Sequence, residues 1–349
     1  MRLNDLINQT SEWVKGTGPE SEVVMSSRIR FARNLENIPF SHWADSEQKK
    51  KVLSIIKSVL NKIDYLRNSI FLEMSSLSTV DRQFLVERHL ISPELAAGSD
   101  SKAVVISDKE IFSCMINEED HLRIQVIRSG FNLEEALRLI ESLDSNLETN
   151  LKFAYNARWG YLTACPTNVG TGMRASVMLH LPALVMTRQI NKVLQTISKL
   201  NLAVRGLYGE GTEASGNFFQ ISNQVTLGYS EKDIVDNITR VIRQVIDYEK
   251  KARSSLVTNK EIELEDKIWR AYGTLSNART ISSKETIELL SLVRLGVNVR
   301  ILESVDIETI NKLFILIQPA HLQKLEGKTL DPRRRDFKRA ELIRDKLKT

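Results

Sequence analysis

Two stretches of the chain alternate apolar and polar residues, which is the period of a β-strand with one buried face. In the first stretch one side of the strand is expected to carry Val24, Ser26, Arg28 and Arg30, with Ile29 and Phe31 on the other. In the second, residues 122–126, Arg123 and Gln125 alternate with three aliphatic residues. Both patterns predict arginine side chains on the polar face of a sheet.

Other stretches repeat apolar residues every three or four positions, which predicts amphipathic helices over residues 133–140, 190–197 and 234–245. After about residue 255 the strand pattern disappears. Short helices are expected there over 287–295 and 307–317, separated by Gly296-Val297-Asn298 and Gln318-Pro319. The predicted fold is α+β, an antiparallel sheet flanked by helices and followed by a smaller all-helical domain. We place the catalytic domain at residues 1–254 and the C-terminal domain at 255–349.

The composition is that of a globular protein in a reducing compartment. Of 349 residues, 42% are hydrophobic and 27% charged. The first twenty residues lack a signal-peptide pattern, and no apolar run approaches the ~20 residues that cross a bilayer. Two cysteines, Cys114 and Cys165, argue against a disulfide framework or a zinc cluster. We expect a cytoplasmic protein with no membrane partner and no protein-held metal.

The net charge of +5 lies in the C-terminal tail, because residues 333–349 contain eight Lys or Arg and three Asp or Glu. Such a tail is able to contact nucleic acid, a membrane surface or an anionic group on a protein. A solvated, basic helix end is the simpler interpretation of the charge alone.

Four segments bring arginines, glycines, carboxylates and a cysteine together: residues 26–30, 117–123, 165–174 and 205–210. A planar guanidinium binds pairs of phosphate oxygens, and phosphoryl transfer depends mainly on positioning and charge neutralisation. The candidate phosphate ligands are Arg28, Arg30, Arg123, Arg174 and Arg205. The chain has no lysine-bearing P-loop and no His-Arg-Asp catalytic loop, so a nucleotide would be held by arginines.

Glu119 and Glu210 are candidates for holding a positively charged acceptor. A guanidinium has a pKa above about 12, so its nitrogen attacks only if carboxylates orient the group and remove a proton. The spacing of residues 118–120 fits an acidic turn between strands equally well.

Cys165 is interpreted as a thiolate beside the acceptor or as a small buried hydrophobe, whereas Cys114 is assigned only the buried role. His89 either hydrogen-bonds a nucleotide or is part of the core, and Trp159 is expected in the core.

Three of these segments, Cys-Pro-Thr-Asn-x-Gly-Thr, Asn-Glu-Glu-Asp-His-Leu-Arg and Arg-Gly-x-x-Gly-Glu, resemble the catalytic half of guanidino (phosphagen) kinases. The resemblance covers about residues 20–250 and implies in-line phosphoryl transfer from ATP, with Mg²⁺ carried by the nucleotide, to a guanidino nitrogen. It implies catalytic roles for Glu119, Glu210 and Cys165. The nucleotide-binding positions that it implies are Ser26, Ser27, Arg28, Ile29, Arg30, His89, Arg123, Arg174, Ala175, Ser176, Val177, Met178, Arg205, Gly206, Leu207, Tyr208, Gly209 and Glu210.

Two departures suggest which acceptor is used. The first arginine motif begins at Ser26, which leaves no room for the helical domain that precedes it in arginine and creatine kinases. A helical extension follows instead, and this arrangement is similar to that of bacterial protein-arginine kinases. The resemblance implies a phosphoarginine-binding segment at Arg335, Asp336, Arg339 and Ala340. On a helix Arg335 and Arg339 share a face, so two arginines would hold the phosphate while Asp336 holds the guanidinium.

The resemblance also implies a homodimer, protein substrates with exposed arginines, an activator protein, and a link to a Clp-type protease and a stress-response repressor. Two alternatives stay open. One is a kinase for free arginine or similar small guanidino compounds. The other is a non-enzymatic regulator or nucleic-acid binder that uses the basic tail. Direct nucleic-acid binding is disfavoured because the tail lacks interleaved aromatic residues that would stack on bases.

Overall fold

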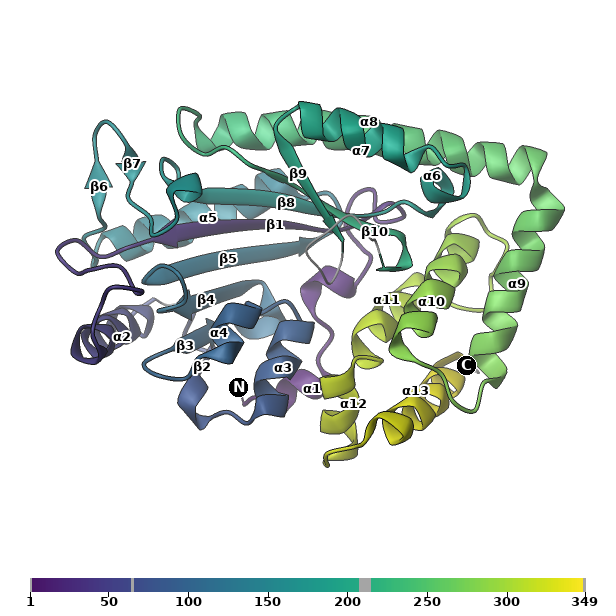
Figure 1. Cartoon of the computed structure of the whole chain (residues 1–349), viewed down its shortest axis with the longest axis horizontal. Helices are drawn as coiled ribbons and strands as arrows, with labels where there is room; N and C mark the ends of the chain where they lie inside the picture. The colour runs from purple at the N-terminus through teal and green to yellow at the C-terminus, as the bar shows by residue number, and fades with distance from the viewer. Residues whose placement is uncertain (1, 64–65, 207–214, 348–349) are drawn as a thin grey trace.

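A computed structural model describes residues 2–63, 66–206 and 215–347. Within these residues one antiparallel sheet of eight strands has the order β2-β3-β4-β5-β1-β8-β10-β9 (Figure 1). A small hairpin, β6-β7, stands at one end of it. The strands are β1 (Val24–Arg33), β2 (Ile70–Glu73), β3 (Ala103–Ile106), β4 (Phe112–Ile116), β5 (Leu122–Ser129), β6 (Tyr155–Asn156), β7 (Gly160–Tyr161), β8 (Met173–His180), β9 (Leu202–Gly206) and β10 (Phe218–Asn223).

Helices α1 to α8 belong to the part of the chain that contains the sheet, and α9 to α13 form the C-terminal region. Their bounds are α1 (Asp5–Asn8), α2 (Ser46–Leu60), α3 (Thr79–Glu87), α4 (Pro93–Ala97), α5 (Leu133–Glu148), α6 (Pro182–Met186), α7 (Ile190–Lys199), α8 (Glu231–Asn259), α9 (Glu261–Asn277), α10 (Ser283–Asn298), α11 (Ile307–Leu316), α12 (Pro319–Glu326) and α13 (Pro332–Leu347). Among the helices described, none is both long and apolar enough to cross a bilayer.

The sheet is covered unequally on its two faces. On one face α2, α5 and α8 pack against the main core, which includes Ile29 and Phe31 of β1. On the other face a second core under α3 and α4 involves only the outer strands, through residues such as Val104 and Met115. Side chains alternate between the two faces along each strand. Beyond the second core, the face opposite the main core therefore carries polar side chains on β5, β1, β8 and β10.

The predicted elements are present, with two local differences. The pairing of β1 with β8 shifts register between Val24 and Ser26, and Val24 is buried in the main core, away from Arg28. Gly296 does not end a helix but lies in the last turns of α10. A Cβ atom there would come within 2.5 Å of Ile268 on α9, so glycine permits the close approach of the two helices.

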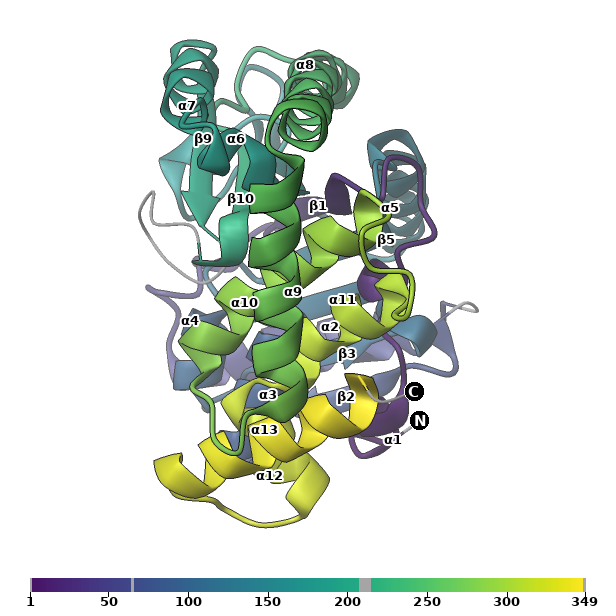
Figure 2. The same ribbon diagram turned by 90° about the vertical axis from the view of Figure 1, so that its right-hand side faces the viewer.

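The C-terminal region is entirely helical in the residues described, which confirms the predicted α+β class with a helical C-terminal part. Figure 2 shows α9 running from the end of α8 to α13, and α10 packs between α9 and α11. The predicted division between residues 254 and 255 falls within α8, whose N-terminus is fixed by a capping box of Ser230 and Asp233. The proposed division into domains stays a prediction.

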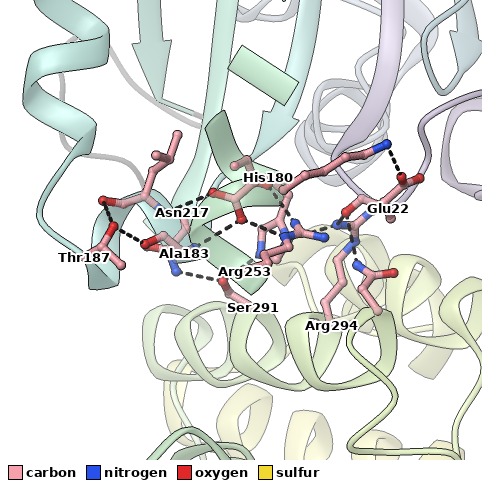
Figure 3. A network of polar contacts seen from close by, with 12 residues as sticks. Glu22, His180, Ala183, Thr187, Asn217, Arg253, Ser291 and Arg294 are labelled. Carbon is pink, nitrogen blue, oxygen red and sulfur yellow. Dashed lines mark hydrogen bonds and ion pairs between the residues drawn. The ribbon is translucent and has the colours of Figure 1, made fainter. Parts of the chain in front are cut away.

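A buried polar network joins the sheet to α10 (Figure 3). The Arg294 guanidinium is fully buried and donates to the backbone carbonyls of Ser21 and Glu22 at 2.7 and 3.1 Å. It also contacts Nδ1 of His180, at the end of β8, at 2.9 Å. Ser291, one turn earlier on α10, contacts the other ring nitrogen of His180 at 2.8 Å. Burial lowers the pKa of Arg294 to about 9, because a cation is costly to bury. The hydrogen bonds to these acceptors stabilise the charged guanidinium.

We expect Arg294→Met to lower the free energy of unfolding by on the order of 3 kcal/mol. The carbonyls of Ser21 and Glu22 and the imidazole of His180 would then be buried without the donor that Arg294 provides. Urea denaturation measures this change. The control is Lys312→Met, which breaks an exposed 2.7 Å ion pair with Glu308 and should cost no more than about 1 kcal/mol. Equal losses for the two variants would contradict a special role for the buried arginine.

Candidate active site

Four arginines lie together on the polar face of the central strands β1, β5 and β8, beyond the part that α3 and α4 cover. Arg28 and Arg30 are two residues apart on β1, and Arg30 pairs with Arg174 of β8 across the sheet. Arg123 stands near the beginning of β5, opposite Ala32 of β1. The antiparallel register thus gathers side chains that are up to about 150 positions apart in the sequence. Arg205 is exposed on the edge strand β9. Burial and then the positive charge of Arg205 lower the pKa of Arg174.

Two polar residues of β10 hold these arginines in place. Arg28 donates to Oε1 of Gln220 at 2.9 Å, and Arg174 donates to Oγ of Ser222 at 3.0 Å. Neither residue belongs to the four motif segments of the sequence. The available signal was the alternation of Gln220 and Ser222 with apolar neighbours, which places both on the polar face of the strand.

The cluster has more positive charge than its immediate carboxylates neutralise. Burial, followed by repulsion from Arg123 and Arg174, lowers the pKa of Arg28 to about 10. Burial and the charges of Arg28, Arg123 and Arg174 lower the pKa of Arg30 well below its usual range. Nε of Arg30 is buried and has no hydrogen-bond partner in the part of the chain described. Such a group is suited to an anionic ligand that supplies the missing acceptors.

Glu118, in the turn between β4 and β5, neutralises Arg123. Its two carboxylate oxygens each accept from Nη1 of Arg123 at 2.7 Å, and Oε1 also accepts from the Ser92 hydroxyl at 2.6 Å. Burial opposes the charged form of Arg123, but the charge and hydrogen bonds of Glu118 raise its pKa overall. Glu118 is thus more than part of the acidic turn that its sequence context predicts, because it orients a candidate phosphate ligand.

Glu119, the next residue of this turn, is exposed and makes no ion pair among the described residues. It lines a cavity of about 400 Å³. Burial, followed by the negative charges of Asp120 and Glu118, raises the pKa of Glu119, while Arg123 and a hydrogen bond from Cys165 oppose the shift. A carboxylate with a raised pKa is a stronger base, so Glu119 is suited to taking a proton.

The Cys165 segment is fixed to the same turn. Oδ1 of Asp120 accepts from the amide N–H of Ala164 at 2.7 Å and from the side chain of Asn34 at 2.6 Å. Cys165 is partly exposed, and its Sγ lies 3.0 Å from Oγ1 of Thr167. These hydrogen bonds hold the thiol beside Glu119.

The remaining predicted nucleotide residues divide between the site and the core. A small pocket beside Arg28 is lined by Trp13, Ser26, Arg28, His89, Ile127, Ser176, Met178 and Gln220. In contrast, the side chains of Ile29, Ala175 and Val177 lie in the main core, and the Ser27 hydroxyl donates to the carbonyl of Gly130. Gly206 ends β9. Leu207, Tyr208, Gly209 and Glu210 lie outside the described residues, so the expected pairing of Glu119 with Glu210 is not described.

His89 has a positive φ of 59° and lines this pocket, where desolvation and then the charge of Arg28 lower its pKa to about 3. It is therefore a neutral imidazole. Cys114 is buried as expected, and burial raises its pKa to about 12. The expectation that Trp159 is a core residue is wrong, because the β6-β7 hairpin leaves its side chain 44% exposed.

The predicted phosphoarginine segment lies on α13, far along the chain from this site. Arg339 is buried and donates to the carbonyls of Ile281 and Ile317 at 2.9 and 2.8 Å. It also pairs with Asp336 at 2.5 Å. Arg335 is partly exposed, and Ala340 is buried. Arg339 and Asp336 therefore also serve to dock α13 on its neighbours.

Comparisons with known proteins agree with this geometry. Residues 51–252 match the ATP:guanido phosphotransferase C-terminal catalytic domain, and residues 261–349 match the protein-arginine kinase McsB C-terminal domain. The protein-arginine kinase of Halothermothrix orenii is 51% identical over 99% of both chains. That of Desulforamulus reducens is 49% identical over 99% of this chain and 98% of its own. The chain belongs to the ATP:guanido phosphotransferase family.

Solved structures of this family share the fold. Lombricine kinase superposes with a TM-score of 0.60 at 23% identity, covering 72% of this chain and 78% of its own. The duplicated taurocyamine kinase of Schistosoma mansoni, with bound transition state analog components, gives 0.60 at 27% identity, covering 72% of this chain and 36% of its own. As a guanido phosphotransferase the chain is an enzyme, a kinase of the phosphagen-kinase type, and ATP is the substrate that the family implies.

We expect iodoacetamide to alkylate the native phosphotransferase at Cys165 and not at Cys114. Cys165 is partly exposed, whereas Cys114 is buried with a pKa of about 12 and forms little thiolate. Peptide mass spectrometry after brief alkylation measures both sites in the same sample. Labelling in denaturant provides the control, since both cysteines should then react. Preferential labelling of Cys114 in the native protein would contradict the described geometry.

Proposed function

We propose that this enzyme is a protein-arginine kinase that transfers the γ-phosphoryl group of Mg-ATP to a guanidino nitrogen of arginine side chains in proteins. The observation that carries the proposal is the under-neutralised cluster of Arg28, Arg30, Arg123 and Arg174 beside the carboxylate of Glu119. The first group fits a polyphosphate donor, and the second fits a cationic acceptor.

In the proposed reaction the acceptor nitrogen attacks the γ-phosphorus in line, so that an N–P bond forms as the bond to the β-phosphate oxygen breaks. Glu119 and Glu210 hold the guanidinium, and a carboxylate takes the proton that the attacking nitrogen loses. ADP is the leaving group, and the arginines stabilise the negative charge that develops on its β-phosphate oxygen. Mg²⁺ enters with the nucleotide and neutralises phosphate oxygens. The nucleotide roles of Ser26 to Arg30, His89, residues 174–178 and residues 205–210, and the role of Cys165 beside the acceptor, are part of this proposal.

A competition assay tests the choice of acceptor. The enzyme is incubated with Mg-ATP, an unfolded basic protein and excess free arginine, and products are analysed by mass spectrometry under non-acidic conditions, because the N–P bond is acid-labile. We expect phosphate on arginine residues of the protein. Phosphorylation of free arginine in preference to the protein would support the small-molecule alternative, and the absence of transfer to either would oppose both.

The finer parts of the proposal concern regulation and context. We place a phosphoarginine-binding site at Arg335, Asp336, Arg339 and Ala340 and a homodimer contact in the same helical region. We further propose a cytoplasmic enzyme that works with an activator protein, marks proteins for a Clp-type protease and relieves a stress-response repressor. The match of residues 261–349 to the C-terminal domain of protein-arginine kinases supports this assignment.

Arg335→Ala should abolish activation by added phosphoarginine while leaving the unstimulated rate within about 2-fold. Arg335 is preferred to Arg339 because the latter is buried and docks α13, so its loss would also destabilise the helix. Arg333→Ala, at an exposed position on the same helix, is the control and should keep the activation. Initial rates measured with and without phosphoarginine decide the matter. Undiminished activation of Arg335→Ala would remove the proposed site.

A further inference from the structure

The N-terminal segment contributes one residue to the pocket beside Arg28 that the sequence motifs do not include. Trp13 lies in the short 3₁₀ helix Glu12–Val14, and its side chain is only 4% exposed. The indole meets the ring of His89 edge-on, with centroids 5.0 Å apart and an interplanar angle of 64°. Both rings line the pocket together with Arg28.

The indole N–H of Trp13 is buried and has no acceptor in the three described stretches of the chain. Buried donors in folded proteins nearly always have a partner, because an unpaired one costs about 1–3 kcal/mol. An indole nitrogen is only able to donate, so its missing partner must be an acceptor. A ligand bound in this pocket would supply it.

The segment that carries Trp13 is held firmly, so its position is preorganised. The carboxylate of Glu12 pairs with Lys15 at 2.7 Å and with Arg128 of β5 at 2.9 Å. The Ser11 hydroxyl donates to Glu110 at 2.6 Å and accepts from the buried Arg88 at 2.7 Å. The indole therefore has little freedom to turn toward another acceptor.

We propose that Trp13 is a nucleoside contact of the nucleotide site and donates its indole N–H to an acceptor atom of the base or ribose. The phosphates belong at the arginine cluster, whereas Trp13, Ile127 and Met178 give the other side of the pocket an apolar character. The pocket measures about 20 Å³, so it receives only an edge of the nucleoside. This inference rests on the proposed function, since it assumes that the arginines hold the phosphates of ATP.

Trp13→Phe tests the contact, because it keeps an aromatic ring and removes the donor. Calorimetric titration compares ADP with inorganic tripolyphosphate, which has phosphates and no nucleoside. We expect the affinity for ADP to fall about 3- to 10-fold, the effect of one neutral hydrogen bond, and the affinity for tripolyphosphate to change less than about 2-fold. Trp269→Phe, at an exposed position on α9, should change neither.

The possible results separate the two proposals. An unchanged ADP affinity in Trp13→Phe, or equal losses for both ligands, would overturn the Trp13 contact while leaving the nucleotide site in place. Failure of the unmodified enzyme to bind either ligand would overturn the site and, with it, the proposed function.

A second measurement does not depend on the stability of the variant. The enzyme labelled with 5-fluorotryptophan gives four resonances, since the chain has four tryptophans. The Trp13 resonance is assigned by replacing the three others, which are all exposed, one at a time. ADP should shift this resonance and tripolyphosphate should not. A resonance that responds to neither, or equally to both, would contradict the proposal.

Discussion

Glu119→Gln is expected to reduce kcat for phosphoryl transfer by about 10²- to 10⁴-fold, the range that a positioned general base contributes, with little change in nucleotide affinity. The amide is of the same size but neither accepts a proton nor attracts the guanidinium by charge. Burial and the neighbouring acidic side chains raise the pKa of Glu119, which favours its action as a base. Single-turnover rates and the dissociation constant of ADP, measured on the same preparation, check both parts.

Glu118→Gln is the matched control for this prediction. Glu118 holds Arg123 through two 2.7 Å contacts, so its loss should raise KM for ATP more than it lowers kcat. A large loss of ADP affinity in Glu119→Gln itself would contradict its assignment to the acceptor. The two neighbouring carboxylates thus provide a test in which each residue has a distinct kinetic signature.

The pH dependence of transfer should follow from the same shift. The carboxylate of Glu119 acts only when it is deprotonated, so a raised pKa moves the acidic limb of the kcat profile to higher pH. We expect this limb above the ordinary glutamate value of about 4.3 and absent in Glu119→Gln, as measured by rates at saturating substrates. An acidic limb that is identical in the variant would assign it to another group.

Arg30→Met is expected to reduce transfer by about 10²- to 10³-fold without lowering the free energy of unfolding. The guanidinium lies among three other arginines, and its Nε is buried with no partner within the described residues, so the folded protein bears an unfavourable charge that a bound anion would compensate. An apolar side chain of similar length removes that repulsion. Turnover and thermal unfolding of the ligand-free variant measure the two effects.

Arg33→Met, three residues further along β1, is the matched comparison. Arg33 is fully buried, and its guanidinium donates to both oxygens of Asp144, with Nη2 at 2.6 Å from Oδ2. Replacing it would leave Asp144 buried and unpaired, at a cost of about 3–5 kcal/mol. If Arg30→Met destabilised the protein as much as Arg33→Met, the claim that Arg30 is held in an uncompensated state would be wrong.

The period of apolar residues predicted the strands and helices that matter for the site because burial acts on every second or every third to fourth residue. Arg28 and Arg30 were correctly placed opposite Ile29 in this way. The pattern failed at Trp159, since an aromatic residue in a short hairpin has no periodicity that distinguishes core from surface. It also gave no sign that Gly296 lies within a helix, because only the neighbouring Ile268 explains that glycine.

The sequence alone determined which side chains share a face of each strand, and its motifs were sufficient to indicate a guanidino phosphotransferase, since local periodicity and residue chemistry are properties of short segments. Only the tertiary structure decided that Arg30 stands beside Arg174, that Gln220 and Glu118 orient the arginines, and that Trp13 joins the same pocket. These relations depend on strand order and register across large separations in the chain, which are set by the packing of the whole sheet.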